Sequence, residues 1–235
     1  MSHASKCTSG GNAPSRDRFH AKELEIIDRY RTPARVQKYL HGLSYNKENP
    51  ETLRSFRGVV RTGSAHCLEA VIASAVILEQ HGYPTTILDL ESEDYLDHVV
   101  HLYRSKRTGL YGSIAMSRDP GLFGRKAAFR TVRELAYSYF DPYIDYTGRI
   151  IGYAVGDLSD LGGYDWRLSD RNVWRVEQYC RDIPHKKLNA SDRRYRYWRK
   201  RYEEFVEKYP DRKPLHYNNK STWLPGYTAK ATRTR

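Results

Sequence analysis

GSAHCLEAVIASAVILEQH, residues 63–81, is a short polar start followed by one long apolar run. The run predicts a strongly apolar helix from Cys67 to His81. Gly82 and Pro84 follow it and predict where the helix ends, because glycine favours the left-handed position after a helix and proline cannot continue one. Cys67 is therefore predicted to lie at a helix N-terminus.

Three β-rich runs follow this helix. They cover Thr85 to Leu90, His98 to Arg104 and Leu110 to Met116, and an acidic loop separates the first run from the second. Their content of β-branched and aromatic residues is typical of strands bounded by turn residues. The order predicts one helix that leads into an antiparallel hairpin.

The segments on either side of this core predict further helices and one more strand. N-cap residues before proline open two of the N-terminal helices, and apolar spacings of three and four indicate buried helix faces. The predicted segments are helices at Phe19 to Tyr30, from Thr32-Pro33 and from Asn49-Pro50, then Ala128 to Phe140, a strand at Ile150 to Val155, and helices at Ser169 to Arg181 and Asp192 to Tyr209. The fold class is α+β.

Length and composition favour one folded domain. The chain has 235 residues, of which 39% are hydrophobic, enough for a sizeable core. We expect a disordered tail at 1–18, a single domain at 19–223 and a flexible basic tail at 224–235. The longest apolar stretch, Ala70 to Leu78, is far shorter than the roughly 20 residues of a spanning helix, so no membrane partner is expected. Three cysteines and no apolar leader favour the cytoplasm.

The net charge of +12 lies mostly in the C-terminal segment, where residues 185–235 hold 15 basic and 5 acidic residues. This segment allows two interpretations. Its arginines and tyrosines are typical of a surface that contacts phosphates and stacks on bases, which would make nucleic acid an accessory partner. Alternatively, the aromatic residues form one buried helix face and the charged face is merely solvated, the interpretation we favour. The aromatic residues are Tyr195, Trp198, Tyr202, Phe205 and Tyr209.

Cys67 is the best candidate nucleophile of the three cysteines. A helix N-terminus favours the thiolate, which is the reactive form, because unpaired N–H groups and the helix dipole stabilise negative charge there. Cys7 lies in the predicted tail, and Cys180 lies near a helix C-terminus, where the dipole has the opposite sign. A nucleophile also needs a base, and His98 opens the strand after the acidic loop. His66 and His101 are weaker candidates.

The segment from Gly63 to Ser117 resembles the core of the transglutaminase-like superfamily. The resemblance rests on Gly63-x-x-x-Cys67-x-x-Ala70, the long apolar helix, His81-Gly82-Tyr83-Pro84, and Asp97-His98-Val99 before a second strand. The flanking segments resemble a bacterial branch of that superfamily. The resemblance implies a papain-like α+β fold with a Cys-His-Asp triad, in which Cys67 matches the nucleophile and His98 the general base.

The third triad position departs from the superfamily pattern. The strand that should supply the aspartate reads Leu-Tyr-Gly-Ser-Ile-Ala-Met-Ser over residues 110–117 and contains no acid. If the hairpin turn centres between Lys106 and Arg107, His98 lies opposite Ala115. Ser113 and Ser117 then share its sheet face, because side chains alternate with a period of two. Ser113 and Ser117 are therefore candidates for orienting His98, while Asp97 points to the other face and Asp119 lies just beyond the strand.

These residues lead us to expect a cysteine hydrolase or acyltransferase that attacks an amide, ester or thioester carbonyl of a peptide or small acyl substrate. No paired CxxC or HxxxH spacing indicates a metal, and no cofactor is expected. Two alternatives remain open. The chain is a non-catalytic member of the fold that binds a peptide or acts as a scaffold, which the strand without an aspartate favours, or it is a basic nucleic-acid-associated module.

Overall fold

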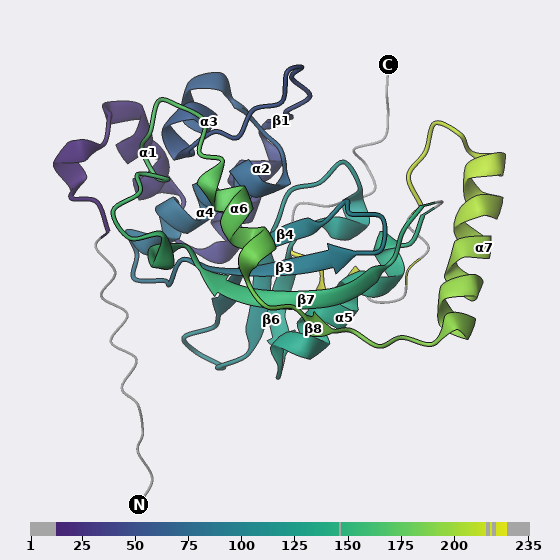
Figure 1. Ribbon diagram of the computed structural model, residues 1–235. Helices are drawn as coiled ribbons and strands as arrows, with labels where there is room; N and C mark the ends of the chain where they lie inside the picture. The colour runs from purple at the N-terminus through teal and green to yellow at the C-terminus, as the bar shows by residue number, and fades with distance from the viewer. Residues whose placement is uncertain (1–12, 146, 215–216, 218–219, 225–235) are drawn as a thin grey trace, which may run out of the picture.

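A six-stranded antiparallel sheet forms the framework of the computed structural model, which describes residues 13–145, 147–214, 217 and 220–224 (Figure 1). The spatial order of the strands is β6-β5-β4-β3-β7-β8. Their bounds are Thr86–Ser92 (β3), His98–Arg104 (β4), Tyr111–Ile114 (β5), Arg125–Phe129 (β6), Ile150–Asp157 (β7) and Lys186–Lys187 (β8). The predicted combination of helices with an antiparallel sheet is confirmed.

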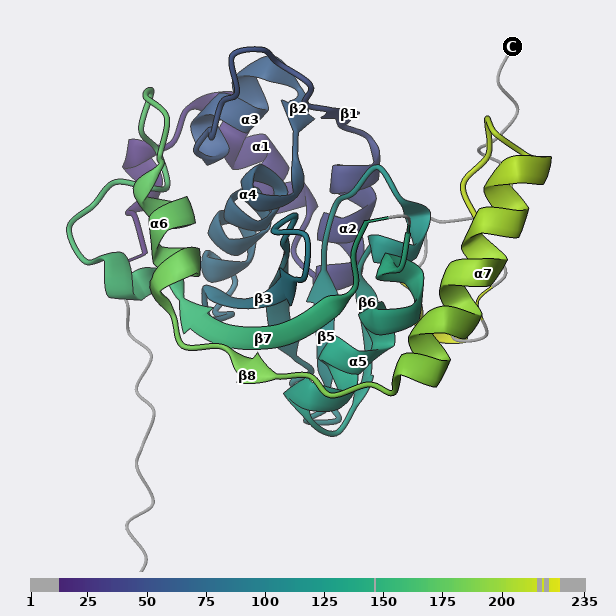
Figure 2. The same cartoon turned by 45° about the vertical axis from the view of Figure 1, so that its right-hand side comes forward.

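Helices cover both faces of this sheet (Figures 1 and 2). On one face lies a large apolar core that includes buried residues of α1, α2, α3, α4 and α6; α5 and α7 contribute to a second core on the other face. The helices are α1 (Ala21–Arg29), α2 (Pro33–His41), α3 (Phe56–Thr62), α4 (Cys67–Glu79), α5 (Val132–Tyr143), α6 (Arg175–Asp182) and α7 (Asp192–Lys208). A short parallel pair, β1 (Ser44–Tyr45) and β2 (Ser64–Ala65), lies just before α4.

The apolar run that decides the fold is α4, as predicted. His66 is its N-cap residue, and the Glu69 carboxylate accepts a hydrogen bond from the His66 N–H at 3.0 Å, part of a capping box. After the helix, Gly82 takes a positive φ of 72° and the Tyr83 N–H donates to the Leu78 carbonyl. Cys67 is thus the first residue of the central helix.

Three predicted helix starts are wrong, and local capping explains two of them. The third helix begins at Phe56 and not at Asn49-Pro50, because Ser55 caps it by accepting from the Gly58 N–H. The segment Arg125–Phe129 is strand β6, and the next helix begins only after Thr131, which caps the Glu134 N–H. Residues 169–174 precede α6 as turns, so that helix begins at Arg175.

The hairpin register also differs from the prediction. β4 and β5 pair His101 with Ile114 and Leu102 with Ser113, two residues away from the expected alignment. Gly109 has a φ of 69° and its N–H donates to the Ser105 carbonyl, so the turn is centred further along the chain than Lys106 and Arg107. A shift of two residues leaves every side chain on its predicted sheet face.

The predicted tails differ in part from the structure. Residues 16–18 form a 3-10 turn, and the Gln80 side chain donates to the Pro14 carbonyl, so residues 13–18 are attached to the domain. At the other end Leu224 is buried and its N–H donates to the Gly124 carbonyl. Residues 1–12 and 225–235, which include Cys7, lie outside the described residues.

Candidate active site

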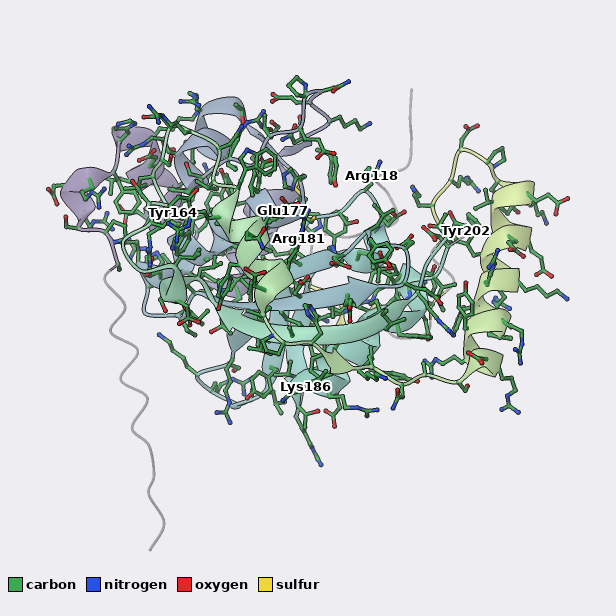
Figure 3. The ribbon with its side chains drawn as sticks, viewed as in Figure 1. Arg118, Tyr164, Glu177, Arg181, Lys186 and Tyr202 are labelled. Atoms are coloured by element: carbon green, nitrogen blue, oxygen red, sulfur yellow. The ribbon has the colours of Figure 1, made fainter. Side chains whose placement is uncertain are left out.

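A cavity of about 450 Å³ opens at the start of α4. Its wall includes Cys67, Asp89 at the middle of β3, the start of β4, the loop 117–122 after β5, and residues of α6. Figure 3 labels four of the lining residues: Arg118 on the loop, Glu177 and Arg181 on α6, and Tyr202 on α7. The cavity therefore joins segments that lie far apart in the sequence around one cysteine.

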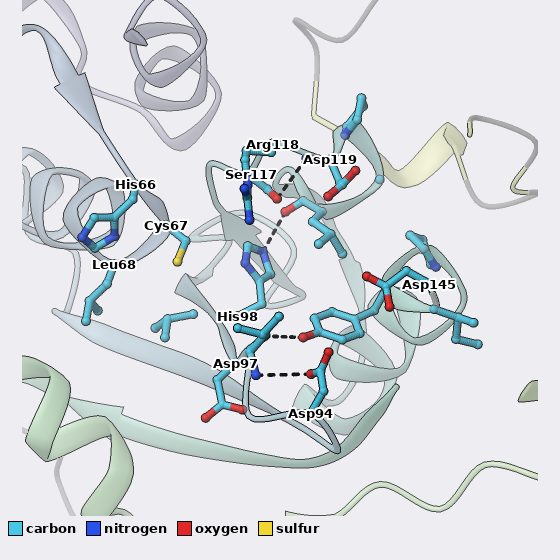
Figure 4. A pocket seen from close by; sticks show the side chains of 18 of the residues that line it. His66, Cys67, Leu68, Asp94, Asp97, His98, Ser117, Arg118, Asp119 and Asp145 are labelled. Carbon is cyan, nitrogen blue, oxygen red and sulfur yellow. Dashed lines mark hydrogen bonds between the residues drawn. The ribbon is translucent and has the colours of Figure 1, made fainter. Parts of the chain in front are cut away.

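The Cys67 thiol is held in the form that a nucleophile needs. Its side chain is partly exposed, and Figure 4 shows the sulfur on the side of α4 that faces the cavity. Burial alone raises the pKa of this thiol, but hydrogen bonds and positive charge from His66 and His98 outweigh it and lower the pKa to about 6. The α4 N-terminus acts in the same direction. A pKa of about 6 favours the thiolate at neutral pH.

His98 is oriented by a backbone carbonyl. Its Nε2 donates to the Leu122 carbonyl at 2.9 Å, which fixes the tautomer and leaves Nδ1 for the Cys67 thiol (Figure 4). The Tyr139 ring packs edge-on against the imidazole at a centroid distance of 5.8 Å. The Leu122 carbonyl thus accepts the hydrogen bond from the imidazole nitrogen that faces away from Cys67.

The two candidate serines lie elsewhere in the network. Ser113 is on the predicted sheet face, but its hydroxyl is 2.7 Å from the Tyr139 hydroxyl and accepts from the Arg125 N–H at 3.1 Å. Ser117 lines the cavity, and its hydroxyl accepts from the Asp119 N–H at 3.1 Å. The structure therefore brings together Cys67 and His98, while both serine hydroxyls bond to other groups.

The remaining candidates, two acids and His101, are bonded to groups other than His98 or Cys67. Asp97 accepts from the Ser92 N–H at 2.8 Å, and Asp119 pairs with Lys213 at 2.8 Å. His101 is fully buried between the Ser74 hydroxyl and the Pro84 carbonyl, on the sheet face opposite His98.

The second cysteine of the cavity, Cys180, is buried, and this burial raises its pKa. The two cysteines of the described residues thus have opposite ionisation tendencies.

His66 has a larger role beside the Cys67 thiol than its position in the sequence predicted. Its Nε2 donates to the Thr52 carbonyl at 2.9 Å. Burial lowers the pKa of His66, but the hydrogen bond and charge of Cys67, with Glu69 nearby, raise it overall. The thiolate therefore has two imidazole neighbours, one on each side of the start of α4.

Sequence reasoning missed two buried residues that hold the site in shape. Glu69 is fully buried and accepts from the N–H groups of Arg54 and His66 and from the Asn46 amide; its spacing from His66 is the capping-box signal that predicts part of this role. Arg125 is fully buried and donates to the carbonyls of Phe123 and Gly121, on either side of Leu122. Nothing in the local sequence indicates the second role.

Within the described ranges, no group of three or more histidine, cysteine, aspartate or glutamate side chains is arranged to bind a metal ion. No helix among these residues is long and apolar enough to cross a membrane. A comparison with models of known protein families finds none that matches the sequence.

Proposed function

We propose that this protein is a cysteine acyl-transfer enzyme, a hydrolase or acyltransferase that resembles the transglutaminase-like superfamily and its papain-like arrangement of helix and sheet. Cys67 is the nucleophile and His98 the general base. The observation that carries the proposal is the His98 imidazole, whose Nε2 is bonded to the Leu122 carbonyl while the ring lowers the pKa of the Cys67 thiol.

The first chemical step forms a thioester on Cys67. The thiolate sulfur attacks the carbonyl carbon of an amide, ester or thioester in a peptide or small acyl substrate. The peptide N–H of Cys67, which has no partner within the first helical turn, donates to the developing oxyanion. The carbon to leaving-group bond then breaks, and the protonated His98 supplies a proton to an amine leaving group.

The second step releases the acyl group. His98 Nδ1 takes a proton from water or from an amine as that molecule attacks the thioester, and the carbon–sulfur bond breaks to regenerate the thiolate. Leu122 keeps the imidazole in place but, as a carbonyl, gives the imidazolium less charge stabilisation than a carboxylate. His66 provides a second positive neighbour for the thiolate, which offsets part of this difference.

An activated ester tests the proposal without knowledge of the substrate. We expect p-nitrophenyl acetate to release a burst of nitrophenolate equal to the protein concentration, with an acetyl group found on Cys67 by peptide mass spectrometry. Cys67→Ala should abolish the burst, and Cys180→Ala should retain it. Acetylation at equal, slow rates on Cys67 and Cys180 would contradict the enzyme and favour the peptide-binding alternative.

A further inference from the structure

The cavity around Cys67 is acidic although the chain as a whole is basic. Seven carboxylate side chains line it, against three lysine or arginine side chains, in a protein of net charge +12. Two of the seven are paired with lining cations, Asp119 with Lys213 at 2.8 Å and Glu177 with Arg181 at 2.9 Å. The third cation, Arg118, lies over the Tyr45 ring, 5.7 Å from its centroid. The cavity therefore holds an excess of negative charge.

The other five carboxylates have no lysine or arginine partner among the described residues. They are Glu51, Asp89, Asp94, Asp97 and Asp145. Asp94, Asp97 and Asp145 accept hydrogen bonds from neighbouring hydroxyl or N–H groups, which hold the carboxylates in place without neutralising them. The carboxylates therefore give the cavity a negative potential that attracts a cationic ligand.

Asp89 is the unusual member of this set. It lies on β3 opposite Val99, the residue that follows His98 on β4, and only 1% of its surface is exposed. Its Oδ2 accepts from His185 Nε2 at 3.2 Å, but its buried Oδ1 has no hydrogen-bond partner among the residues that the structure describes. A buried carboxylate oxygen without a donor is costly, and a ligand that supplies N–H groups offsets that cost.

We infer that this acidic cavity, with Asp89 in its buried wall, selects an acyl substrate that carries a positively charged group, a primary ammonium or a guanidinium. Such a group supplies the N–H donor that Asp89 Oδ1 lacks and is attracted by the unpaired carboxylates around it. The inference rests on the proposed function, because it places the charged group of the substrate beside the thiolate that attacks its carbonyl. Even when His66, His98 and His185 are all protonated, the seven lining carboxylates outnumber the six cationic side chains.

Charged thiol reagents with one common reactive group test the selectivity. Aminoethyl, hydroxyethyl and sulfonatoethyl methanethiosulfonate all react in the same way: the thiolate sulfur attacks the reagent's sulfenyl sulfur, a mixed disulfide forms and methanesulfinate leaves. The rate at Cys67 of the full chain is measured by peptide mass spectrometry and divided by the rate with 2-mercaptoethanol. We expect the normalised rate to be about tenfold higher for the cationic than for the neutral reagent, and lowest for the anionic one.

Two isosteric variants test whether Asp89 is the source of the preference for the cationic reagent. Asp89→Asn should lower the cationic preference several-fold, whereas Glu25→Gln, which removes an equal charge from an exposed position on α1, should leave it unchanged. Equal normalised rates for the three reagents in the unaltered protein would overturn the inference, whatever the variants do. Slow reaction with all three would instead contradict the reactive thiolate, so failure of the selectivity and failure of the proposed function give different results.

Discussion

Removal of His98 is the most direct way to test whether Cys67 is a reactive thiolate or an ordinary cysteine. We predict that His98→Ala raises the pKa of Cys67 by about one pH unit or more, because a charge-assisted hydrogen bond is worth about 1.5–3 kcal/mol and one pKa unit is about 1.4 kcal/mol. The pH dependence of iodoacetamide alkylation at Cys67 measures this. His20→Ala, at a largely exposed histidine, is the control and should leave the pKa unaltered; an equal pKa in both variants would refute the role of His98.

Arg125 is a positioning residue for the same imidazole. Its guanidinium holds the carbonyls of Gly121 and Phe123, and the Leu122 carbonyl between them bonds to His98. We predict that Arg125→Lys lowers the unfolding free energy by about 1–3 kcal/mol, because one ammonium cannot reproduce the planar fork. Urea unfolding measures the loss.

The same Arg125→Lys variant should acetylate more slowly at Cys67 and move the alkylation midpoint upward, changes that a purely structural role would not produce. Lys126→Arg, at the neighbouring exposed position, is the matched control. A destabilised Arg125→Lys variant with an unshifted midpoint would contradict the positioning role.

The pair of Cys67 and His98 could be predicted from the sequence, but the group that orients His98 could not. Cys67 and His98 are identifiable because a helix start and a strand start have recognisable sequence signals. Every residue has a backbone carbonyl, so residue types give no indication that the Leu122 carbonyl orients His98. For this reason side chains, those of Ser113 and Ser117, were predicted for this role. Asp89 was not predicted, because the lack of a partner for its Oδ1 is visible only in the coordinates.

At the scale of elements, the start of α4 depends on one buried carboxylate. Glu69 accepts from two backbone N–H groups and from Asn46, so its loss leaves buried donors without an acceptor. We predict that Glu69→Ala lowers the unfolding free energy by about 3 kcal/mol, measured by urea unfolding. Glu134→Ala removes the equivalent capping-box carboxylate of α5, at an exposed position, and should cost only about 1 kcal/mol. Equal costs would show that burial at Glu69 adds nothing.

The packing of α4 on β4 makes stability depend on pH through His101. Burial lowers the pKa of His101 to about 4, below the value of about 6.5 expected for the unfolded chain. Between these values the unfolded chain binds a proton that the folded protein does not, so stability falls as the pH falls from about 6.5 to 4. We predict that the unfolding free energy of His101→Gln falls less over this window, by up to about 1.4 kcal/mol per pH unit. Parallel curves for the two proteins would contradict a neutral buried His101.

Element boundaries were predictable where periodicity was strong and were wrong where capping decides. The apolar run of α4 and the β3 and β4 strands appear at their predicted places, because hydrophobic pattern alone determines them. Ser55 and Thr131 place two helix starts later than predicted, because their side chains accept hydrogen bonds from first-turn N–H groups. The register of the β4–β5 hairpin depends on which turn residue takes a positive φ. That residue is Gly109, which was not predicted.

At the scale of the whole molecule, the net positive charge of residues 185–235 contrasts with the excess of carboxylates in the cavity. On α7 only Trp198 is buried, and several arginines pair with acids, Arg194 with Asp141 at 2.6 Å and Arg199 with Glu203 at 2.9 Å. These pairs and the partly buried aromatic face support the interpretation of α7 as a packing helix with a solvated charged side. Nucleic-acid binding through residues 185–235 stays a prediction, and a steep loss of oligonucleotide binding with salt would support it.

Cys67 is predicted to be a thiolate near neutral pH, and the rate of its alkylation as a function of pH tests this most directly. Iodoacetamide labelling of the full chain, quantified at each cysteine by peptide mass spectrometry, should reach half its maximal rate at Cys67 near pH 6. Cys180, whose pKa burial raises, should remain almost unlabelled over the same range. A midpoint at Cys67 near the ordinary thiol value of about 8.5, or labelling no faster than at Cys180, would contradict the account.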